Sequence, residues 1–472
     1  STTMHFMPGC EILQSFDLVH WEHVTYVYET LDHTDAQQLK SGQNIYGQGM
    51  WAASLRYHEG RFYICFVAND TRKTYLYTSE KIDGPWKKQL IEGFYHDGSL
   101  LFDEDGRNYI VYGNDEIWIT ELNEDLTAPK KDGLHRLLVS DHKNPELGYE
   151  GSHIQKINGY YYIFLVHSLR DRWMRTEACF YSDSLEGEFT GGDVLCDDRG
   201  YCGQGVAQGG IVDTPDGKWY AMLFQDSGAV GRIPILLPVT WKDHFPFFGQ
   251  NGHVPEEIEV HSTRPGYIYQ PLVGSDDFCN GLLPRWQFNH DPDPRYYHLD
   301  ALQGTYTITT REVCTELTQA VNTLTQRMSY PSCAAEVTVD ASALKEGDVA
   351  GLCALQSCYA AVGITKHHGK YEVLMLDKKE DGILDMTEGT VVESHQMDFR
   401  LEADFCNMKD EARCYYRVNK GDWLPIGTVH KLYFKLDHFT GCRFGLFCYA
   451  AEETGGSACF RDFKYYDVDE IS

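Results

Sequence analysis

Four similar segments recur in the first half of the chain and constrain its fold more than any other feature. They read YHEGRFYICF, DEDGRNYIVY, KINGYYYIFL and TPDGKWYAML, and each carries a turn glycine, two further residues and then a tyrosine. Glycine readily adopts the left-handed conformation that tight turns need, so each segment predicts a β-hairpin. The turn glycines lie roughly 50 residues apart; they are Gly60, Gly106, Gly159 and Gly217.

Short strands repeating at this interval are typical of β-propeller blades. The segment up to Trp21 has the pattern of the back half of one more blade. We therefore expect an all-β chain that begins with a five-bladed propeller, residues 1–268, whose first blade is incomplete. Proline, glycine and acidic residues then indicate a linker. Alternating strands such as AEVTVD and KLYFKLD follow it and predict a β-sandwich over residues 275–472.

The repeat also aligns polar residues between the blades. The residues nine positions before the four turn glycines are Trp51, Asp97, Glu150 and Gln208. Inner strands of a propeller run along a central channel, so equivalent positions at their starts should meet at one mouth of it. Two carboxylates and an aromatic residue at such positions are a poor choice for packing alone. We therefore expect Glu150 to be functional.

Composition excludes several classes of partner. The formal net charge is −29, which disfavours nucleic acid and anionic membrane surfaces. No run of 18 apolar residues predicts a membrane span. The 15 cysteines are scattered without a CxxC pair, which favours a reducing compartment, and we expect a cytoplasmic protein, with secretion left open. Whether the chain forms a homo-oligomer is left open.

The residues favour glycoside hydrolysis over other chemistries. That reaction needs one carboxylic acid to protonate the leaving oxygen and a second carboxylate to activate water or to attack the sugar. The aromatic content of 13% suits a cleft that stacks on sugar rings, although β-strands alone also favour aromatics. The chain has no HExxH motif, no GxSxG motif and no phosphate-binding glycine loop.

Several longer segments resemble glycoside hydrolase family 43, in its two-domain branch of β-xylosidases and α-L-arabinofuranosidases. They are GMWAASLRYHEGRFYICF, HDGSLLFDEDGRNYIVYG, YEGSHIQKINGYYYIF and GGIVDTPDGKWYAMLFQDSGAVGRIPILLPVTW, and in the second half DDFCNGLLPRWQFN and NTLTQRMSYPSCAAEVTVDAS. The resemblance covers nearly the whole chain. It implies a five-bladed propeller followed by a β-sandwich, an inverting mechanism, and an exo-acting enzyme that releases xylose or arabinose from short hemicellulose oligosaccharides.

The resemblance also implies roles for single residues. Glu150 would be the general acid, and Asp97 would orient it and tune its pKa. Arg232, in GAVGRIP, would bind sugar hydroxyls. Trp51 would line the pocket, and Phe6 is the aromatic residue expected to reach the pocket from TTMHFMPG.

The sequence departs from the family pattern in two places. The general base of the family is an Asp in an Asp-Pro motif, which would lie upstream of Ser1, and no residue of this chain matches it. Many members carry His where this chain has Gln208, often near an ion in the channel. Gln is a poorer metal ligand but a competent hydrogen bonder. We therefore expect Gln208 to contact substrate and no cofactor to be required, with a structural calcium ion in the channel left open.

Simpler explanations exist for each residue. Asp97 precedes a glycine and would also suit a turn, Trp51 would suit a core, and Arg232 would suit an ordinary ion pair. Glu146 is a rival acid but lies out of register with the repeat. Two other functions stay open: a carbohydrate-binding protein that lacks the base, and a structural propeller that mediates protein contacts.

Overall fold

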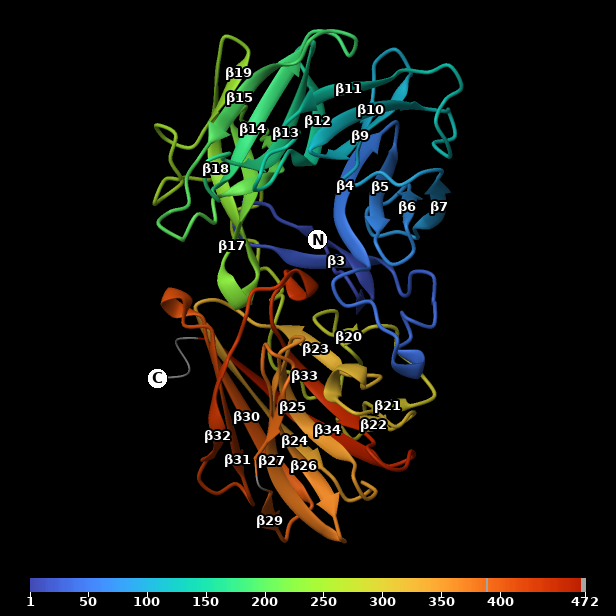
Figure 1. Ribbon diagram of the computed structural model, residues 1–472, viewed down its shortest axis with the longest axis vertical. Helices are drawn as coiled ribbons and strands as arrows, with labels where there is room; N and C mark the ends of the chain where they lie inside the picture. The colour runs from blue at the N-terminus through green and yellow to red at the C-terminus, as the bar shows by residue number, and fades with distance from the viewer. Residues whose placement is uncertain (388, 468–472) are drawn as a thin grey trace.

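The computed structural model describes residues 1–387 and 389–467, and over these residues the protein is built almost wholly of β-strands. Four separate four-stranded antiparallel sheets are arranged around a common centre in a propeller-like manner, in the upper part of Figure 1. In the described part of the chain the helical segments are short 3-10 turns: Lys40–Gly42, Gly228–Val230, Leu317–Gln319, Cys406–Met408 and Leu436–His438.

Each of the four sheets is a meander that begins with one of the predicted hairpins. The turns form as expected: Gly60, Gly106, Gly159 and Gly217 all have φ near +80°. The strands are, sheet by sheet, β4 (Met50–His58), β5 (Arg61–Ala68), β6 (Lys73–Ser79) and β7 (Lys87–Ile91); β8 (Ser99–Phe102), β9 (Asn108–Asn114), β10 (Glu116–Leu122) and β11 (His135–Ser140); β12 (Glu150–Ile157), β13 (Tyr160–Ser168), β14 (Arg175–Ser182) and β15 (Thr190–Leu195); β16 (Ala207–Asp213), β17 (Trp219–Asp226), β18 (Arg232–Lys242) and β19 (Phe245–Phe248).

Hydrophobic cores lie between neighbouring sheets. One core joins β9 and β10 of the second sheet to β12 and β13 of the third, and includes Ile117 and Ile163. The next joins the third sheet to the fourth, with Phe164 packed against Phe248. Because each sheet buries apolar side chains on both faces, the sheets hold one another at fixed angles around the centre.

A two-stranded sheet precedes the first four-stranded sheet. It consists of β2 (Gly9–Gln14) and β3 (Glu22–Tyr28), and it packs against β5 and β6 through Tyr28, Phe66 and Tyr77. This is the segment whose pattern predicts the back half of a further blade. The structure thus contains four four-stranded sheets and one two-stranded sheet in the propeller region.

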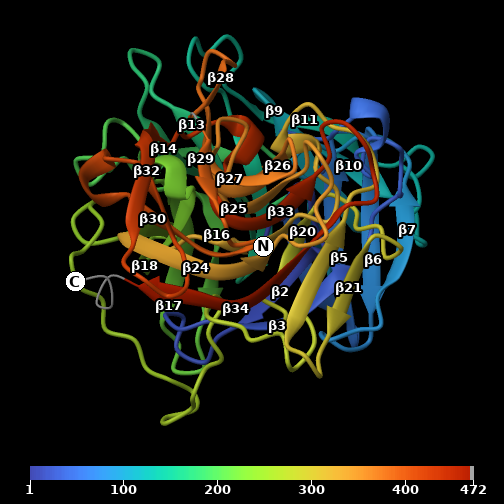
Figure 2. The same ribbon diagram turned by 90° about the horizontal axis from the view of Figure 1, so that it is seen from below.

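The second half of the chain forms two large sheets that share one core. A nine-stranded sheet and a seven-stranded sheet bury Leu352 and Val362 of the first against Val337 and Phe399 of the second. Figure 2, viewed from below, shows these sheets in front of the propeller. The strands are β20 (Gln287–Asn289), β21 (Tyr297–Asp300), β22 (Thr305–Thr309), β23 (Leu324–Arg327), β24 (Ser332–Asp340), β25 (Val349–Leu355), β26 (Ala360–His367), β27 (Lys370–Lys378), β28 (Leu384–Met386), β29 (Thr390–Val392), β30 (Gln396–Asp404), β31 (Glu411–Arg417), β32 (Leu424–Lys431), β33 (Arg443–Tyr449) and β34 (Ser457–Asp467).

The first strand of the chain belongs to this second region and not to the propeller. Strand β1 (Phe6–Met7) pairs with β20, and Phe6 lies opposite Asn289. The side chain of Phe6 is fully buried, and the guanidinium of Arg443 lies 3.6 Å from the centre of its ring. This strand ties the start of the chain to the nine-stranded sheet.

Two further observations bear on the chain as a whole. The described residues contain no helix that is long and apolar enough to cross a membrane. All 15 cysteines have free thiols, and ten of them are buried. The buried ones are Cys10, Cys65, Cys179, Cys314, Cys333, Cys353, Cys358, Cys414, Cys442 and Cys448.

Candidate active site

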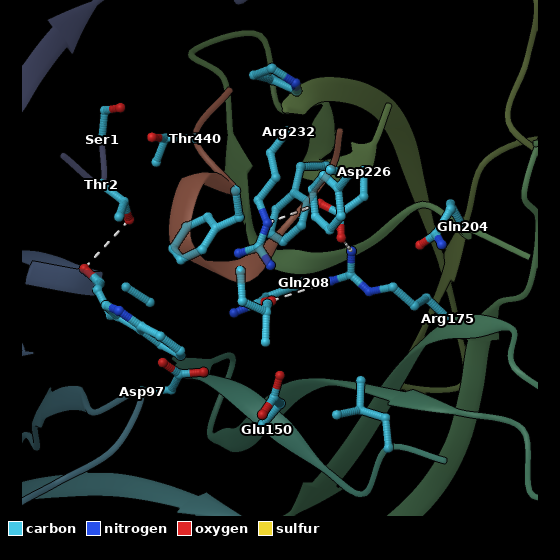
Figure 3. A pocket seen from close by; sticks show the side chains of 18 of the residues that line it. Ser1, Thr2, Asp97, Glu150, Arg175, Gln204, Gln208, Asp226, Arg232 and Thr440 are labelled. Atoms are coloured by element: carbon cyan, nitrogen blue, oxygen red, sulfur yellow. Dashed lines mark hydrogen bonds and ion pairs between the residues drawn. The ribbon is translucent and has the colours of Figure 1, made fainter. Parts of the chain in front are cut away.

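One cavity of about 570 Å³ opens where the inner strands of the four sheets begin. Trp51, Asp97, Glu150 and Gln208 all line it, each contributed by a different sheet or by the turn just before it. Figure 3 shows Asp97, Glu150 and Gln208 directed toward the same space, with Arg175, Asp226 and Arg232 across from Glu150. The positions that share a register in the sequence therefore share a site.

Irregular pairing at the cavity end of three inner strands turns Trp51, Glu150 and Gln208 toward the space. The ladder slips between Glu150 and His153 in β12, and equivalent slips occur in β4 and β16. Such bulges redirect side chains at strand ends. Gly151 has a φ of +68°, and a Cβ there would lie 2.6 Å from Cγ of Gln208. A glycine is needed here so that the third and fourth sheets can approach beside Glu150.

Glu150 is the centre of a small group of polar side chains. Nδ2 of Asn114 donates a hydrogen bond of 2.8 Å to Oε2 of Glu150. Nε2 of His96 lies 3.7 Å from Oε2 of Glu150 and 3.7 Å from Oδ2 of Asp97. Oδ2 of Asp97 accepts a hydrogen bond of 3.0 Å from the backbone N–H of Gly151. The two carboxylates are therefore held close together with one imidazole between them.

Burial and mutual charge shift the titration of this group. Burial raises the pKa of Asp97, the charge of His96 opposes that rise, and the negative charge of Glu150 adds to it. Burial lowers the pKa of His96, but its contacts with Glu150 and Asp97 outweigh burial, so that the pKa is raised overall. A carboxyl group buried as that of Asp97 is can retain a proton where an exposed carboxylic acid would lose it.

A network of two arginines around one aspartate forms the opposite wall. Asp226 accepts from Nη1 of Arg175 at 3.0 Å and from Nε of Arg232 at 2.9 Å. Arg175 also donates to Oε1 of Gln208 at 3.3 Å. The side chain of Arg175 is 4% exposed and that of Arg232 is 26% exposed. Arg175 is thus a structural element, whereas Arg232 has donors left that face the cavity.

The backbone of Gln208 is held in place by a buried acid, Glu177. Its φ is +68°, and its backbone N–H donates a hydrogen bond of 2.7 Å to Oε2 of Glu177. Burial raises the pKa of Glu177 well above its usual range, although the hydrogen bond from Gln208 and the charge of Arg175 oppose the rise. The fixed backbone holds the amide of Gln208 at the cavity wall.

The second region of the chain closes one side of the cavity. Phe439 lies 5.5 Å from Trp51 in an edge-to-face contact, and the guanidinium of Arg232 lies 4.2 Å from the centre of the Phe439 ring. The backbones of Gly231 and Gly441 meet directly, because a Cβ on Gly231 would lie 2.5 Å from the N of Gly441. The segment 434–440 is therefore part of the site although it lies far away in the sequence.

The structure corrects the position that the sequence predicted for Phe6. It was expected in the pocket, but it lies in the core of the second region, under Arg443 and beside His5, and does not line the cavity. The segment TTMHFMPG does supply lining residues, but they are Ser1 and Thr2. An aromatic residue in a two-residue strand carries no local signal that says which of two neighbouring cores it will enter.

Sequence reasoning also missed several residues of the site. His96 stands next to Asp97 and was detectable from that position alone. Asn114, Arg175 and Asp226 lie at strand ends of the predicted sheets, where the repeat pattern carries less information. Phe439 had no local signal, because it reaches the cavity only through packing between the two regions.

The residues around Gln208 do not fit a calcium ion. Oε1 of Gln208 already accepts from Arg175, whose positive charge would repel a cation at that oxygen. Among the described residues, the one cluster with a metal-binding spacing is His96, Asp97 and Glu150, whose ligand atoms lie within 4.8 Å of one another. Those groups are the polar side chains around Glu150 described above.

Comparison with protein families gives two matches that together cover most of the chain. The model of glycosyl hydrolases family 43 matches residues 1–246. The model of the β-xylosidase C-terminal concanavalin A-like domain matches residues 275–466. The first match ends within β19, and the second begins in the segment without named strands that separates β19 from β20.

Several individual proteins also resemble this chain. A β-xylosidase of Formosa agariphila is 25% identical over 99% of this chain and 85% of its own length. A non-reducing end α-L-arabinofuranosidase of Bacteroides ovatus is 22% identical over 82% of this chain and 75% of its own length. A solved structure described as a bifunctional GH43-CE protein of Bacteroides eggerthii is 41% identical, with a TM-score of 0.91 over 99% of this chain. The present chain spans 60% of that protein.

Proposed function

The chain belongs to glycosyl hydrolase family 43, and on that premise we propose that it is an exo-acting, inverting glycosidase that releases xylose or arabinose from short xylan-derived oligosaccharides. The observation that carries this proposal is the convergence of Glu150, Asp97 and Arg232 on one cavity that the segment 434–440 closes on one side. A cavity closed in this way favours attack at a chain end. The names of the relatives from Formosa agariphila and Bacteroides ovatus support the two sugars.

Glu150 has the position of the general acid. It is 22% exposed at its side chain, so it reaches the cavity, and Asn114 fixes its orientation from the side. In this role it gives its proton to the glycosidic oxygen as the bond to the leaving group breaks. Asp97, buried and anchored to the backbone of Gly151, would orient Glu150 and place a second carboxyl group beside it.

Arg232, Gln208 and Trp51 would bind the sugar that is released. Arg232 is pre-oriented by Asp226 and sandwiched between Phe224 and Phe439, so it can direct its remaining N–H groups to sugar hydroxyls without reorganisation. Trp51 supplies an apolar face at the opposite wall.

The general base is expected from chain upstream of Ser1. An inverting enzyme places its two carboxyl groups roughly 6.5–9.5 Å apart to admit a water molecule. Asp97 is too close to Glu150 for that, and both oxygens of Asp226 are engaged by arginines. The same upstream chain would supply the inner strands of a fifth blade, with β2 and β3 as its outer pair.

The decisive experiment compares two substrates and two lengths of the chain. Residues 1–472, and the same chain extended by its natural upstream residues, are assayed on 4-nitrophenyl β-xyloside and 4-nitrophenyl α-L-arabinofuranoside. We expect hydrolysis by the extended chain, with the product anomer inverted in proton NMR. Retention of configuration would contradict the mechanism. Binding of xylo-oligosaccharides without hydrolysis by either chain would favour the alternative of a non-catalytic carbohydrate-binding protein.

The free, mostly buried thiols are consistent with action in a reducing, cytoplasmic compartment. A structural calcium ion would need ligands other than the side chain of Gln208.

A further inference from the structure

An exposed tryptophan stands at the mouth of the cavity. Trp173 is 40% exposed and lines the same cavity as Glu150, and it lies in the loop between β13 and β14. Tryptophan has the largest apolar surface of any side chain, so covering it with a ligand is favourable. Trp51 already supplies an apolar face on the wall of the cavity, so the second indole, that of Trp173, needs a separate explanation.

The loop that carries Trp173 is held in place. Oγ of Ser168 accepts a hydrogen bond of 2.8 Å from the N–H of Met174 and donates one of 3.2 Å to the carbonyl of Arg172. Arg170 pairs with the buried Asp141 at 2.6 Å. Gly203 allows close approach from the next loop, since a Cβ there would lie 2.5 Å from the carbonyl oxygen of Trp173. The indole is therefore presented by an ordered loop, which lowers the entropy cost of binding to it.

The pairing of the third sheet places this loop on the same side of the site as Glu150. Glu150 lies opposite Val166, and the loop begins two residues later, after Ser168. Strand β12 thus begins at the same end of the sheet at which β13 leads into the loop. The acid donates its proton to the leaving oxygen, so the remainder of the substrate must extend past Glu150 on that side.

We propose that Trp173 is a specificity-determining residue that stacks on the sugar unit of the leaving group, and that it makes the enzyme prefer oligosaccharides to substrates with small leaving groups. The inference rests on the proposed function. A pyranose ring has an apolar face that matches the flat indole in shape, and both are uncharged, so the negative charge of the protein does not oppose their contact. Leu147 also lines the cavity, and its carbonyl accepts a hydrogen bond of 2.9 Å from the N–H of Ser168, where the loop begins.

The test compares two substrates with the same released sugar. One is the pentosyl fluoride, whose leaving group is too small to reach Trp173, and the other is the matching trisaccharide of the pentose that the wild type releases. For Trp173→Ala and Trp173→Leu we expect kcat/KM on the trisaccharide to fall about ten- to thirty-fold. On the fluoride both variants should stay within about twofold of the wild type, and Trp173→Phe should retain most of the activity on both substrates.

Phe247→Ala is the matched control, because Phe247 is 50% exposed in β19 and does not line the cavity. It should leave both substrates unaffected. Equal losses on the two substrates for Trp173→Leu, or no loss on the trisaccharide, would overturn the inference while leaving the proposed function intact. Failure of the wild-type chain, extended upstream, to cleave either substrate would instead overturn the proposed function and the inference with it.

Discussion

Asp97 and Glu150 are linked through a single backbone amide: Oδ2 of Asp97 accepts a hydrogen bond of 3.0 Å from the N–H of Gly151, the residue that follows Glu150. The link holds a buried carboxylate beside the more exposed one. Because the two groups interact, their protons are best described as belonging to the pair. The pair, and not Glu150 alone, should set the pH range in which the enzyme works.

Replacing Asp97 by asparagine should move the alkaline limb of the pH profile of kcat/KM to lower pH. The negative charge of Asp97 favours retention of the proton that the pair donates, so without it the proton is lost at lower pH. Asp105→Asn, at an exposed hairpin turn, is the control and should leave the profile unchanged. A lower rate with an unmoved limb would assign Asp97 to positioning alone.

Replacing Glu150 by glutamine should lower kcat/KM on oligosaccharides by about 10²–10⁴-fold, because the amide keeps the hydrogen-bonding shape but has no proton to donate at neutral pH. The loss should be smaller on an aryl glycoside with a highly acidic phenol, which leaves without protonation. Steady-state kinetics on both substrates provide the measurement. Equal losses on the two substrates would speak against a general acid.

Replacing Asp226 by alanine should damage stability more than replacing Arg232 does. Without Asp226 the buried guanidinium of Arg175 loses its carboxylate partner, which costs about 3–5 kcal/mol of unfolding free energy. Arg232→Ala leaves the Asp226–Arg175 pair intact, so it should raise KM at least tenfold with little loss of stability. Urea denaturation and steady-state kinetics separate the two effects. A reversed order would mean that Arg232 is the structural member of the network.

Replacing Gly441 by alanine should loosen the contact between the propeller and the second region. A Cβ on Gly441, whose φ is +99°, would lie 2.1 Å from the carbonyl oxygen of Val230, next to Gly231 and Arg232. We expect a loss of about 2–4 kcal/mol in unfolding free energy together with reduced activity. Gly382→Ala, with a φ of +83° and no neighbour within 4 Å, is the control and should cost about 1 kcal/mol without affecting activity.

Acidification should destabilise the boundary between the two regions through buried histidines. His5, His290 and His438 gather around Tyr46 there, with ring centroids 4.6–5.4 Å apart. Burial, helped by the charge of His438, lowers the pKa of His290 to about 3, and burial also lowers the pKa of His5 well below its usual value. The unfolded chain therefore binds more protons than the folded one over the range from the ordinary histidine pKa down to the folded value.

The stability that His290 contributes should accordingly be complete above about pH 6.5 and be lost as the pH falls, by about 2 kcal/mol between pH 6.5 and pH 5. His5→Phe keeps an aromatic ring but removes one titrating group, so its unfolding free energy should depend less on pH over this range. Urea denaturation at several pH values measures the slope. An unchanged slope in the variant would show that His5 is not part of the effect.

Much of the site could be predicted from sequence because turn chemistry is local. A glycine with positive φ fixes each hairpin, and counting back a constant number of residues reaches the start of the inner strand in every sheet. The four residues identified by that count, Trp51, Asp97, Glu150 and Gln208, all line one cavity in the structure. Arg232 was recognisable as a charged residue in an apolar strand that needs a partner, and the partner proved to be Asp226.

The sequence by itself thus determined the all-β character, the hairpin repeat and the register of the polar positions, since each of these depends on residues close together in the chain. Only the tertiary structure decided that Phe6 enters the core of the second region, that Arg175 and Arg232 share Asp226, and that Phe439 completes the cavity. Those outcomes depend on contacts between distant segments, in which several apolar or charged partners are chemically equivalent and packing selects one. The local periodicity of the sequence does not indicate which of these partners is selected.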